Sequence, residues 1–162
     1  MMLTWDRVLE LVNYDAETGA LTWRRSKGAA KAGSPVGGRH RVKGYGEACI
    51  DGTYVQTHRL IWFIAYGVWP DGEIDHMNGI PDDNRLANLR DVPVATNRQN
   101  IRSATKRSAG GLLGAHKTKY GRWQAAICVN RKQIHLGMFD TPEDAHSAYL
   151  AAKREMHAGC TI

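Results

Sequence analysis

The sequence predicts an α+β protein made of two small units in succession, and three observations support this. Short strand and hairpin patterns alternate with helical patterns along the 162 residues. A hydrophobic content of 43% is enough for one ordinary core or two small ones. The segment RSATKRSAGG at 102–111 is small, basic and glycine-ended, so it is expected to be a linker.

The first unit is expected to open with a short helix followed by two β-hairpins. Thr4 can cap an amphipathic helix within MMLTWDRVLELV. Gly19 and the pair Asp51-Gly52 stand between apolar segments, which is typical of hairpin turns. Residues 58–66, which include most of the apolar stretch LIWFIAYGVW, are predicted to form a mostly buried helix.

No segment has the features of a membrane span or a secretory signal. A transmembrane helix needs about 20 apolar residues, and no stretch approaches that length. Asp6 and Glu10 interrupt the apolar N-terminus, unlike a signal peptide. The three cysteines are widely spaced and include no CxxC pair, so neither a disulfide framework nor a cysteine zinc site is indicated. We therefore expect a cytoplasmic protein with no membrane partner.

The charge distribution points to a polyanionic partner. The net charge is +6, and residues 18–46 and 98–135 contain many Lys and Arg but no Asp or Glu. Acidic residues gather instead at 71–91. An acidic segment between two basic segments is the charge distribution expected of a metal site within a nucleic-acid-binding surface. The alternative is that the basic segments are merely solvated faces.

The second unit shows two strands and a helix in order. In GRWQAAICV, Trp123, Ala125 and Ile127 alternate with polar or small residues, as in a strand with one apolar face. NRK supplies a turn and QIHLGMF a further strand. Thr141 at the N-cap and Gly159 past the end mark a helix in DTPEDAHSAYLAAKREMHAG. One side of this helix is a stripe of mostly small residues that is predicted to pack on a three-stranded sheet. The stripe consists of Ala145, Ala148, Tyr149, Ala152 and Met156.

The opposite face of this sheet is predicted to bind double-stranded DNA. A basic ribbon rich in hydrogen-bond donors can enter a major groove. The residues expected to contact DNA, on this face and in the adjoining basic segments, are Arg102, His116, Lys117, Thr118, Lys119, Tyr120, Arg122, Gln124, Arg131, Lys132, Gln133 and His135.

The segment GAHKTKYGRWQAAICVNRKQIHLGMFDTPEDAHSAYLAAKREMHAG resembles the plant ethylene-response-factor (Apetala-type) DNA-binding domain. The similarity rests on GRW with alternating Ala and Ile, on LGxF, and on T-x-E-D-A-x-x-A-Y. It implies a domain at 112–162 that reads the major groove with its sheet. This sequence has fewer arginines on that sheet than the plant pattern, so the target sequence does not transfer.

A polar stretch, EIDHMNGIPDDNRLANLRDVPVATNRQN at 73–100, has the side chains that phosphodiester hydrolysis needs. Asp75 offers a carboxylate oxygen and Asn97 an amide oxygen, and both suit Mg²⁺. Neighbouring side chains on an extended segment point to opposite sides. Asp75 is therefore expected to hold a metal while His76 faces the scissile phosphate, where an imidazole can act as general base for water.

Residues 58–100 resemble the HNH nuclease motif in its phage homing-endonuclease form. HRL, xDHxNG, N-x-x-x-NLR and T-x-x-x-N occur in order. The resemblance implies a ββα-metal (His-Me finger) module at 58–101 that holds one divalent ion, Mg²⁺ or Mn²⁺. It implies that His76 is the general base, that Asp75 and Asn97 are metal ligands, and that Asn88 braces the hairpin and orients His76.

The resulting hypothesis is a metal-dependent HNH DNA endonuclease of homing type. Residues 1–57 are expected to be an N-terminal DNA-gripping region. A single active site per chain favours nicking by a monomer, and no protein partner is indicated. The resemblance implies a phage origin and hence the host cytoplasm. The alternative is a non-catalytic, sequence-specific DNA-binding regulator, in which the central module only adds contacts.

Each site assignment has a structural alternative. Asp75 and Asn78 could form turns, Asn88 could bond a helix to a loop, and Asn97 could be a cap. His58 could be structural or contact phosphate instead of being catalytic. Three arginines could bind phosphate or pair with the neighbouring acids Asp82, Asp83 and Asp91: they are Arg59, Arg85 and Arg90.

Overall fold

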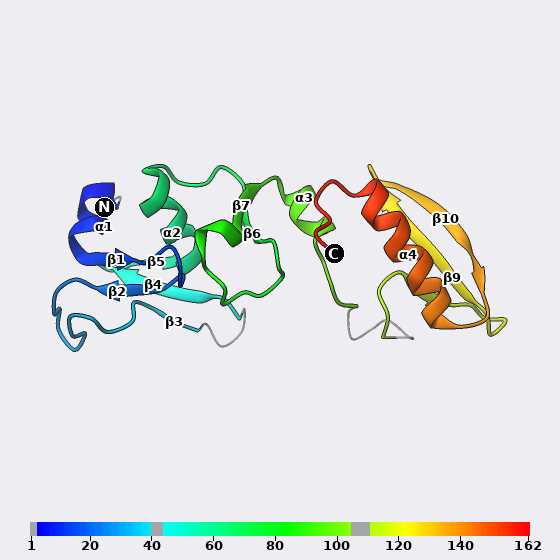
Figure 1. The fold of residues 1–162 in the computed structure, drawn as a ribbon, viewed down its shortest axis with the longest axis horizontal. Helices are drawn as coiled ribbons and strands as arrows, with labels where there is room; N and C mark the ends of the chain where they lie inside the picture. The colour runs from blue at the N-terminus through cyan, green and yellow to red at the C-terminus, as the bar shows by residue number, and fades with distance from the viewer. Residues whose placement is uncertain (1–2, 40–43, 105–110) are drawn as a thin grey trace. The chain divides into compact units, whose positions relative to one another are not determined.

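The computed structural model describes residues 3–39, 44–104 and 111–162, in two compact units, Met1–Pro93 and Val94–Ile162. Both units combine helices with small antiparallel sheets, as expected for an α+β protein (Figure 1). Much of the predicted linker, at 105–110, and the N-terminal basic loop, at 40–43, lie outside the described residues. Within the described part, no helix is both long and apolar enough to cross a membrane.

The first unit begins with helix α1 (Trp5–Leu11), whose N-cap is Thr4 as predicted. The Thr4 hydroxyl accepts a hydrogen bond from the Arg7 backbone N–H at 3.4 Å. Strands β1 (Val12–Tyr14) and β2 (Leu21–Trp23) then form an antiparallel hairpin. Gly19 has a φ of +77° in the connecting turn, a conformation that glycine adopts at no steric cost.

Three further strands form an antiparallel sheet in the order β3-β4-β5. They are β3 (Gly38–Arg39), β4 (Gly46–Ile50) and β5 (Thr53–Gln56). Asp51 and Gly52 connect β4 to β5 with φ values of 48° and 82°, which confirms the predicted hairpin turn. Helix α2 (Thr57–Tyr66) follows and ends at Gly67, whose φ is 74°.

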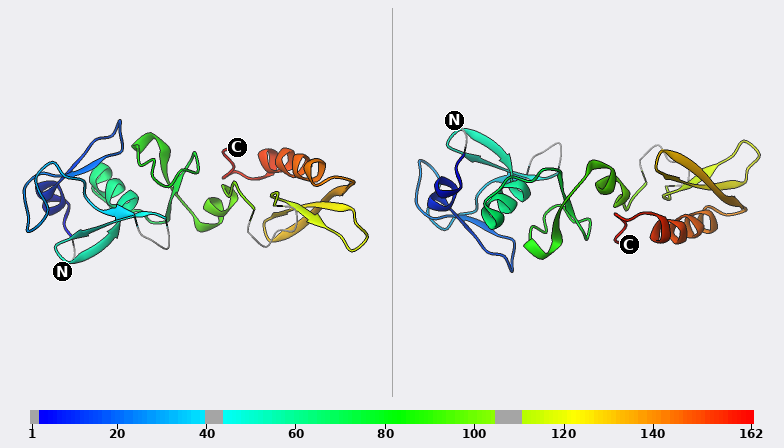
Figure 2. Two further views of the ribbon diagram at one scale, coloured as in Figure 1. Left: turned by 90° about the horizontal axis from the view of Figure 1, so that it is seen from below. Right: turned by 90° about the horizontal axis from the view of Figure 1, so that it is seen from above.

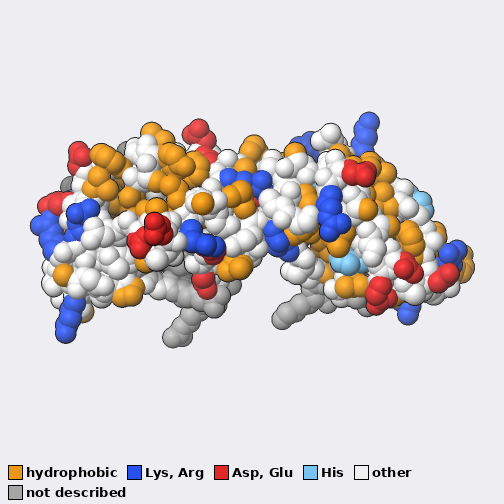
Figure 3. All heavy atoms as spheres, in the orientation of Figure 1, with side chains coloured by type: hydrophobic (Ala, Val, Ile, Leu, Met, Phe, Trp, Pro, Cys, Tyr) orange, Lys and Arg blue, Asp and Glu red, His pale blue; other side chains and the backbone are white. Residues whose placement is uncertain are grey.

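The core of the first unit lies where α1 and α2 pack together and where α2 packs on β4 and β5. Its fully buried side chains come from α1, α2 and β4 and include Val8, Ile50, Leu60 and Ile61, while Val55 of β5 is partly buried against them. Figure 3 shows hydrophobic side chains that remain on the surface over α1 and α2. The exposed large hydrophobic residues of this unit include Trp5 on α1, Tyr66 on α2, and Val68 and Trp69 after α2.

A further antiparallel strand pair completes the first unit. Strands β6 (Glu73–His76) and β7 (Leu89–Val92) pair antiparallel, and the 3-10 helix η1 (Leu86–Asn88) leads into β7. Ile74 and Leu89 are buried in the same core as α2. The hairpin is therefore anchored by apolar side chains from both of its strands.

The second unit contains helix α3 (Val94–Gln99) and a sheet of order β10-β9-β8 covered by a helix. The strands are β8 (Ala115–Lys117), β9 (Trp123–Val129) and β10 (Lys132–Phe139). Helix α4 (Pro142–Met156) lies across one face of this sheet (Figures 1 and 2). The Thr141 hydroxyl accepts the Asp144 backbone N–H at 3.1 Å, which confirms the predicted cap.

The buried side of α4 differs in one respect from the predicted small-residue stripe. Ala145 and Ala152 are buried as expected, whereas Met156 is 40% exposed. Lys153 is buried in its place, and its ammonium group donates to the Ile101 carbonyl oxygen. A lysine can occupy this position because its long stem packs with apolar atoms while a carbonyl satisfies the charged end.

We expect Leu60→Ala to lower the free energy of unfolding of the first unit by about 2–5 kcal/mol, because Leu60 is fully buried and its loss leaves a cavity. Val68→Ala is the control, since Val68 is 62% exposed and its truncation should change stability by no more than about 0.5 kcal/mol. Urea unfolding measures both. Equal losses for the two variants would contradict this core.

Candidate active site and DNA-binding face

The β6–β7 hairpin places Asp75 and His76 at the buried end of β6. In the strand register, Asp75 lies opposite Arg90 and His76 opposite Leu89. Asp75 is only 6% exposed and His76 only 4%. Strand β6 is anchored by the core and ends in a turn, in which the Gly79 N–H donates to the His76 carbonyl at 2.8 Å. The backbone positions from which both side chains extend are therefore fixed.

The His76 ring is held by a residue that the sequence hypothesis did not single out. Its Nε2 lies 3.0 Å from Oδ1 of Asn84, in the loop between β6 and η1. Asn84 is the first residue of the N-x-x-x-NLR pattern. That pattern, eight residues after His76, was the signal that could have identified it.

Two further rings pack against His76. The His58 ring, at the start of α2, is edge-on to His76 with ring centroids 5.4 Å apart. Tyr45 is edge-on to His58 at 5.1 Å and stacks near-parallel to His76 at 6.0 Å. The proposed general base thus stands in a cluster of three rings.

His58 is a buried imidazole whose polarity the protein only partly satisfies. Within the described part of the chain, His58 Nδ1 has no hydrogen-bond partner. Burial, with smaller contributions from the nearby His76 and Arg59, lowers the His58 pKa to about 4. The ring is therefore neutral near pH 7, which fits a packing role against His76 better than a phosphate contact through a charged imidazolium.

Asn88 braces the hairpin loop through three hydrogen bonds. Its Oδ1 accepts the Asn78 N–H at 2.9 Å, and its Nδ2 donates to the Asn78 side-chain oxygen at 3.0 Å and to the Asp83 carbonyl at 2.7 Å. Asn88 is 8% exposed, so these bonds satisfy nearly all of its buried polar atoms. This geometry agrees with the bracing role expected of Asn88, while the bond to the His76 ring comes from Asn84.

The arginines near the site pair with protein groups. Arg90 donates from Nε and from a terminal nitrogen to Oδ2 of Asp75, at 2.9 and 2.7 Å. Arg85 pairs with Asp83 at 2.5 Å and thereby lowers the Asp83 pKa. Arg59 donates to the backbone carbonyls of residues 70 and 72. These contacts favour the structural interpretation for Arg59 and Arg85, and they couple Arg90 to a proposed metal ligand.

Asn97 lies on α3, which belongs to the second unit, so its pairing with Asp75 stays a prediction. Within the second unit, the end of α3 and the segment that follows it are tied to the C-terminal residues. Gln99 accepts the Gly159 N–H at 2.9 Å, and Arg102 donates to the Thr161 carbonyl at 3.0 Å and hydroxyl at 2.6 Å. Arg102, a predicted DNA contact, thus has a structural role.

The donors of the predicted metal site are chemically suited to a hard divalent cation. Asp75 contributes carboxylate oxygens, which Mg²⁺ and Mn²⁺ prefer, and Mg²⁺ is usually bound through one or two carboxylates with water and phosphate oxygens. Across the described ranges, no three His, Cys, Asp or Glu side chains converge as a metal-binding group. The predicted donors, one carboxylate and one amide, are of the kind that Mg²⁺ completes with water and phosphate oxygens.

In the second unit, four polar side chains share the sheet face opposite α4. Pairing places His116 beside Gln124, Gln133 beside Cys128, and His135 beside Ala126, so their side chains point to one side. Gln124 Nε2 lies 3.1 Å from His135 Nδ1, consistent with that shared face. The predicted DNA-facing residues His116, Gln124, Gln133 and His135 are thus brought together.

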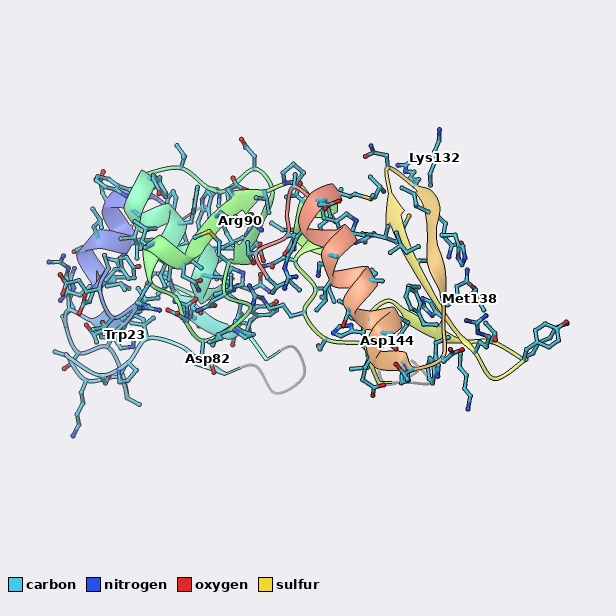
Figure 4. All side chains as sticks on the ribbon, turned by 45° about the vertical axis from the view of Figure 1, so that its right-hand side comes forward. Trp23, Asp82, Arg90, Lys132, Met138 and Asp144 are labelled. Carbon is cyan, nitrogen blue, oxygen red and sulfur yellow. The ribbon has the colours of Figure 1, made fainter. Side chains whose placement is uncertain are left out.

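Other predicted contacts lie at the ends of this sheet. Lys119 and the 80% exposed Tyr120 stand in the β8–β9 loop, and Arg131 stands in the β9–β10 turn. Lys132 is the first residue of β10, next to that turn (Figure 4). Lys117 instead shares the face of Trp123, with its Nζ 5.9 Å from the Trp123 ring.

Two of these predicted contacts already make internal bonds. Arg122 donates to Asp140 at 3.0 Å and to the Met138 carbonyl at 3.2 Å. The Thr118 hydroxyl donates to the Arg122 carbonyl at 2.9 Å. The face itself carries amide and imidazole side chains, and the Lys and Arg side chains stand at its ends.

The acid-free N-terminal tract is not a uniformly cationic surface. Arg25 pairs with Glu10, and Lys27 pairs with Asp51, so acids outside the tract neutralise cations within it. Arg7 also pairs with Asp51, at 2.7 Å, and the pKa of Asp51 falls to about 2 because Arg7 and Lys27 bond to it. The DNA-gripping role of residues 1–57 stays a prediction. The cations named here are already paired with carboxylates of the same unit.

Comparisons with known proteins agree with both resemblances. Residues 55–102 match the sequence model of a family described as HNH endonuclease. In a separate region, 49 residues are 45% identical to an ethylene-responsive transcription factor of Arabidopsis thaliana, over 29% of this chain and 19% of that protein. The chain thus spans about a fifth of this curated relative. These findings confirm the two similarities and associate the chain with nucleases and with DNA-binding proteins.

The low His58 pKa predicts a pH dependence of stability. An unfolded His58 has a pKa near 6.5 and the folded one about 4, so the unfolded chain binds more protons between these values. The stabilisation is complete above pH 6.5 and is lost as the pH falls towards 4, by about 3 kcal/mol in total.

We expect His58→Leu to lose less stability than the wild type between about pH 7 and about pH 4.5, because it lacks this proton uptake. Urea unfolding at both pH values measures the difference. The control replaces the exposed His116 by Leu, and this variant should lose as much stability between the two pH values as the wild type does. If His58→Leu and the wild type lose equal amounts, burial does not lower the His58 pKa.

Proposed function

We propose that the protein is a metal-dependent DNA endonuclease that hydrolyses phosphodiester bonds with its central HNH-like segment and contacts double-stranded DNA with its C-terminal sheet. One observation carries the proposal. Within the segment similar to HNH endonucleases, Asp75 and His76 are adjacent, buried and anchored at the end of β6. A carboxylate suited to a metal ion and an imidazole suited to proton transfer are thereby held at neighbouring positions of one strand.

His76 is assigned as the general base. An imidazole takes a proton near neutral pH, so it can remove one from the water that attacks phosphorus. Asn84 and the neighbouring rings restrict its motion, which keeps the basic nitrogen oriented. Asn88 contributes indirectly by holding the loop that carries Asn84.

Asp75 and Asn97 are assigned as the residues that would hold Mg²⁺ or Mn²⁺. When bound, such an ion polarises the phosphate and neutralises the charge that develops on the leaving oxygen. Arg90 keeps the Asp75 carboxylate in one orientation through its two bonds to Oδ2. The β6–β7 hairpin followed by α3 has the element order of a ββα-metal module.

The C-terminal sheet is assigned as the DNA-contacting element. Its exposed face presents the amides and imidazoles of Gln124, Gln133, His116 and His135, groups that can hydrogen-bond base edges. The cations at its two ends, including Lys119 and Lys132, are suited to phosphates. The similarity to a plant transcription factor supports this assignment.

Three finer features belong to the same proposal. One active site per chain favours single-strand nicking by a monomer. A homing-type role and a phage origin follow from the HNH resemblance, and a cytoplasmic location would follow from that origin.

The first test incubates supercoiled plasmid with the full-length protein and Mg²⁺, Mn²⁺ or EDTA. We expect metal-dependent nicking, and we expect His76→Ala to reduce its rate by about 10²- to 10⁴-fold with DNA affinity retained, because only the base is removed. Mobility shift and nicking rate are measured on the same samples. His116→Ala is the matched control and should nick bound DNA at the wild-type rate.

The outcomes separate the two candidate functions. Cleavage by His76→Ala at the wild-type rate would show that His76 is not the base. Wild-type protein that binds DNA but cleaves no substrate with either metal would favour the regulator.

A second test concerns the sheet. We expect Lys132→Ala to reduce the slope of log affinity against log salt by about 0.9, the contribution of one phosphate contact on duplex DNA. Arg154→Ala is the control, since Arg154 lies on α4 and donates to the Ile162 carbonyl at 3.2 Å. Affinity is measured by fluorescence anisotropy at several salt concentrations. An unchanged slope for Lys132→Ala, or equal slopes for the two variants, would remove this end of β10 from the DNA interface.

A further inference from the structure

We propose that Asn84, held in place by the N-terminal β1–β2 hairpin, is a positioning residue that fixes the tautomer of His76. The inference rests on the proposed function in treating His76 as the general base. The hydrogen bond itself belongs to the folded chain whatever its activity. It gives the N-terminal hairpin a structural role in the site.

The bond between Asn84 and His76 has a defined direction. Oδ1 of Asn84 lies 3.0 Å from His76 Nε2, and an amide oxygen can only accept. Nε2 must therefore carry the proton, and in the neutral ring Nδ1 then carries the lone pair. Nδ1 is consequently the nitrogen that takes the proton from water.

The N-terminal hairpin packs directly on the backbone of Asn84. The Tyr14 hydroxyl, at the end of β1, donates to the Asn84 carbonyl oxygen at 3.0 Å. Gly19, in the hairpin turn, approaches so closely that a Cβ there would lie 2.7 Å from the Asn84 carbonyl carbon and 2.6 Å from the Arg85 nitrogen. Only glycine fits this approach and its φ of +77°.

The other side of the loop is fixed by the residues next to Asn84. The Asn84 N–H donates to the Asp82 carbonyl at 3.1 Å, and the Asp83 carbonyl accepts from Asn88 Nδ2 at 2.7 Å. The backbone of Asn84 is thus held from two directions, by the hairpin turn and by the loop network. Its side chain loses little further freedom when it bonds to His76.

The consequence for the reaction is a base with a single tautomer. Without the acceptor, part of the His76 population would carry its proton on Nδ1 and could not take one there. Loss of the partner that sets a catalytic histidine's tautomer can cost up to about 10⁴-fold in rate. The two asparagines thus have different roles: Asn84 bonds to the proposed base, and Asn88 holds the loop.

The test is a long-range proton–nitrogen NMR correlation of the full-length protein labelled with ¹⁵N-histidine. Spectra are recorded at about pH 8.5, where an ordinary imidazole with a pKa near 6.5 is neutral. The His76 signals are identified by their loss in His76→Ala. We expect a protonated Nε2 whose proton is protected from exchange with water.

Asn84→Ala should lose this protected proton and shift the ring nitrogens towards a mixture of tautomers. Asn84→Asp keeps the shape and an acceptor oxygen, so it should retain the Nε2–H signal. Asn13→Ala is the control, because Asn13 is exposed on β1, and it should match the wild type. A wild-type His76 protonated on Nδ1, or a protected proton that survives in Asn84→Ala, would overturn the inference.

Cleavage kinetics form the second arm. We expect Asn84→Ala to lower kcat about 10- to 100-fold with KM unchanged, and Asn84→Asp to restore part of it. A higher KM with an unchanged kcat would assign Asn84 to DNA binding and contradict the positioning role. If the tautomer result holds and the wild type cleaves no DNA, the nuclease proposal fails and the positioning contact stands.

Discussion

The pairing of β6 with β7 is the constraint on which the candidate active site depends. Ile74 and Leu89 anchor the hairpin in the core, and the strand register then fixes the residues beside them. Asp75 comes to lie opposite Arg90, where the buried carboxylate obtains a charged partner. A slip of one residue would move Ile74 out of the core and Asp75 away from Arg90, so the core and the site are specified together.

Burying so many polar side chains is possible only because they bond to one another. An unpaired buried amide or carboxylate costs about 1–3 kcal/mol or more, which is a large fraction of a small domain's stability. Asn88 and Asn78 satisfy each other, and Asn84 bonds to His76. The loop network that stabilises the hairpin therefore also orients the proposed base.

In the second unit, one face of the sheet packs against α4 and the other face is not covered by that helix. Small side chains such as Ala125 and Ala145 let α4 approach the sheet closely. The opposite face is left to polar side chains from three strands. The division explains why the strand pattern predicted that face well, whereas Lys117, at the end of β8, falls on the helix side.

The sequence by itself determined the local elements and the chemistry of the site. The Asp51-Gly52 turn, the Thr4 and Thr141 caps and the strand alternation of the second unit depend on neighbours within a few residues, so their pattern predicts them. Only the tertiary structure decided which groups meet. The bond from the Tyr14 hydroxyl to the Asn84 carbonyl joins residues that are 70 positions apart along the chain, and no local pattern encodes such a contact.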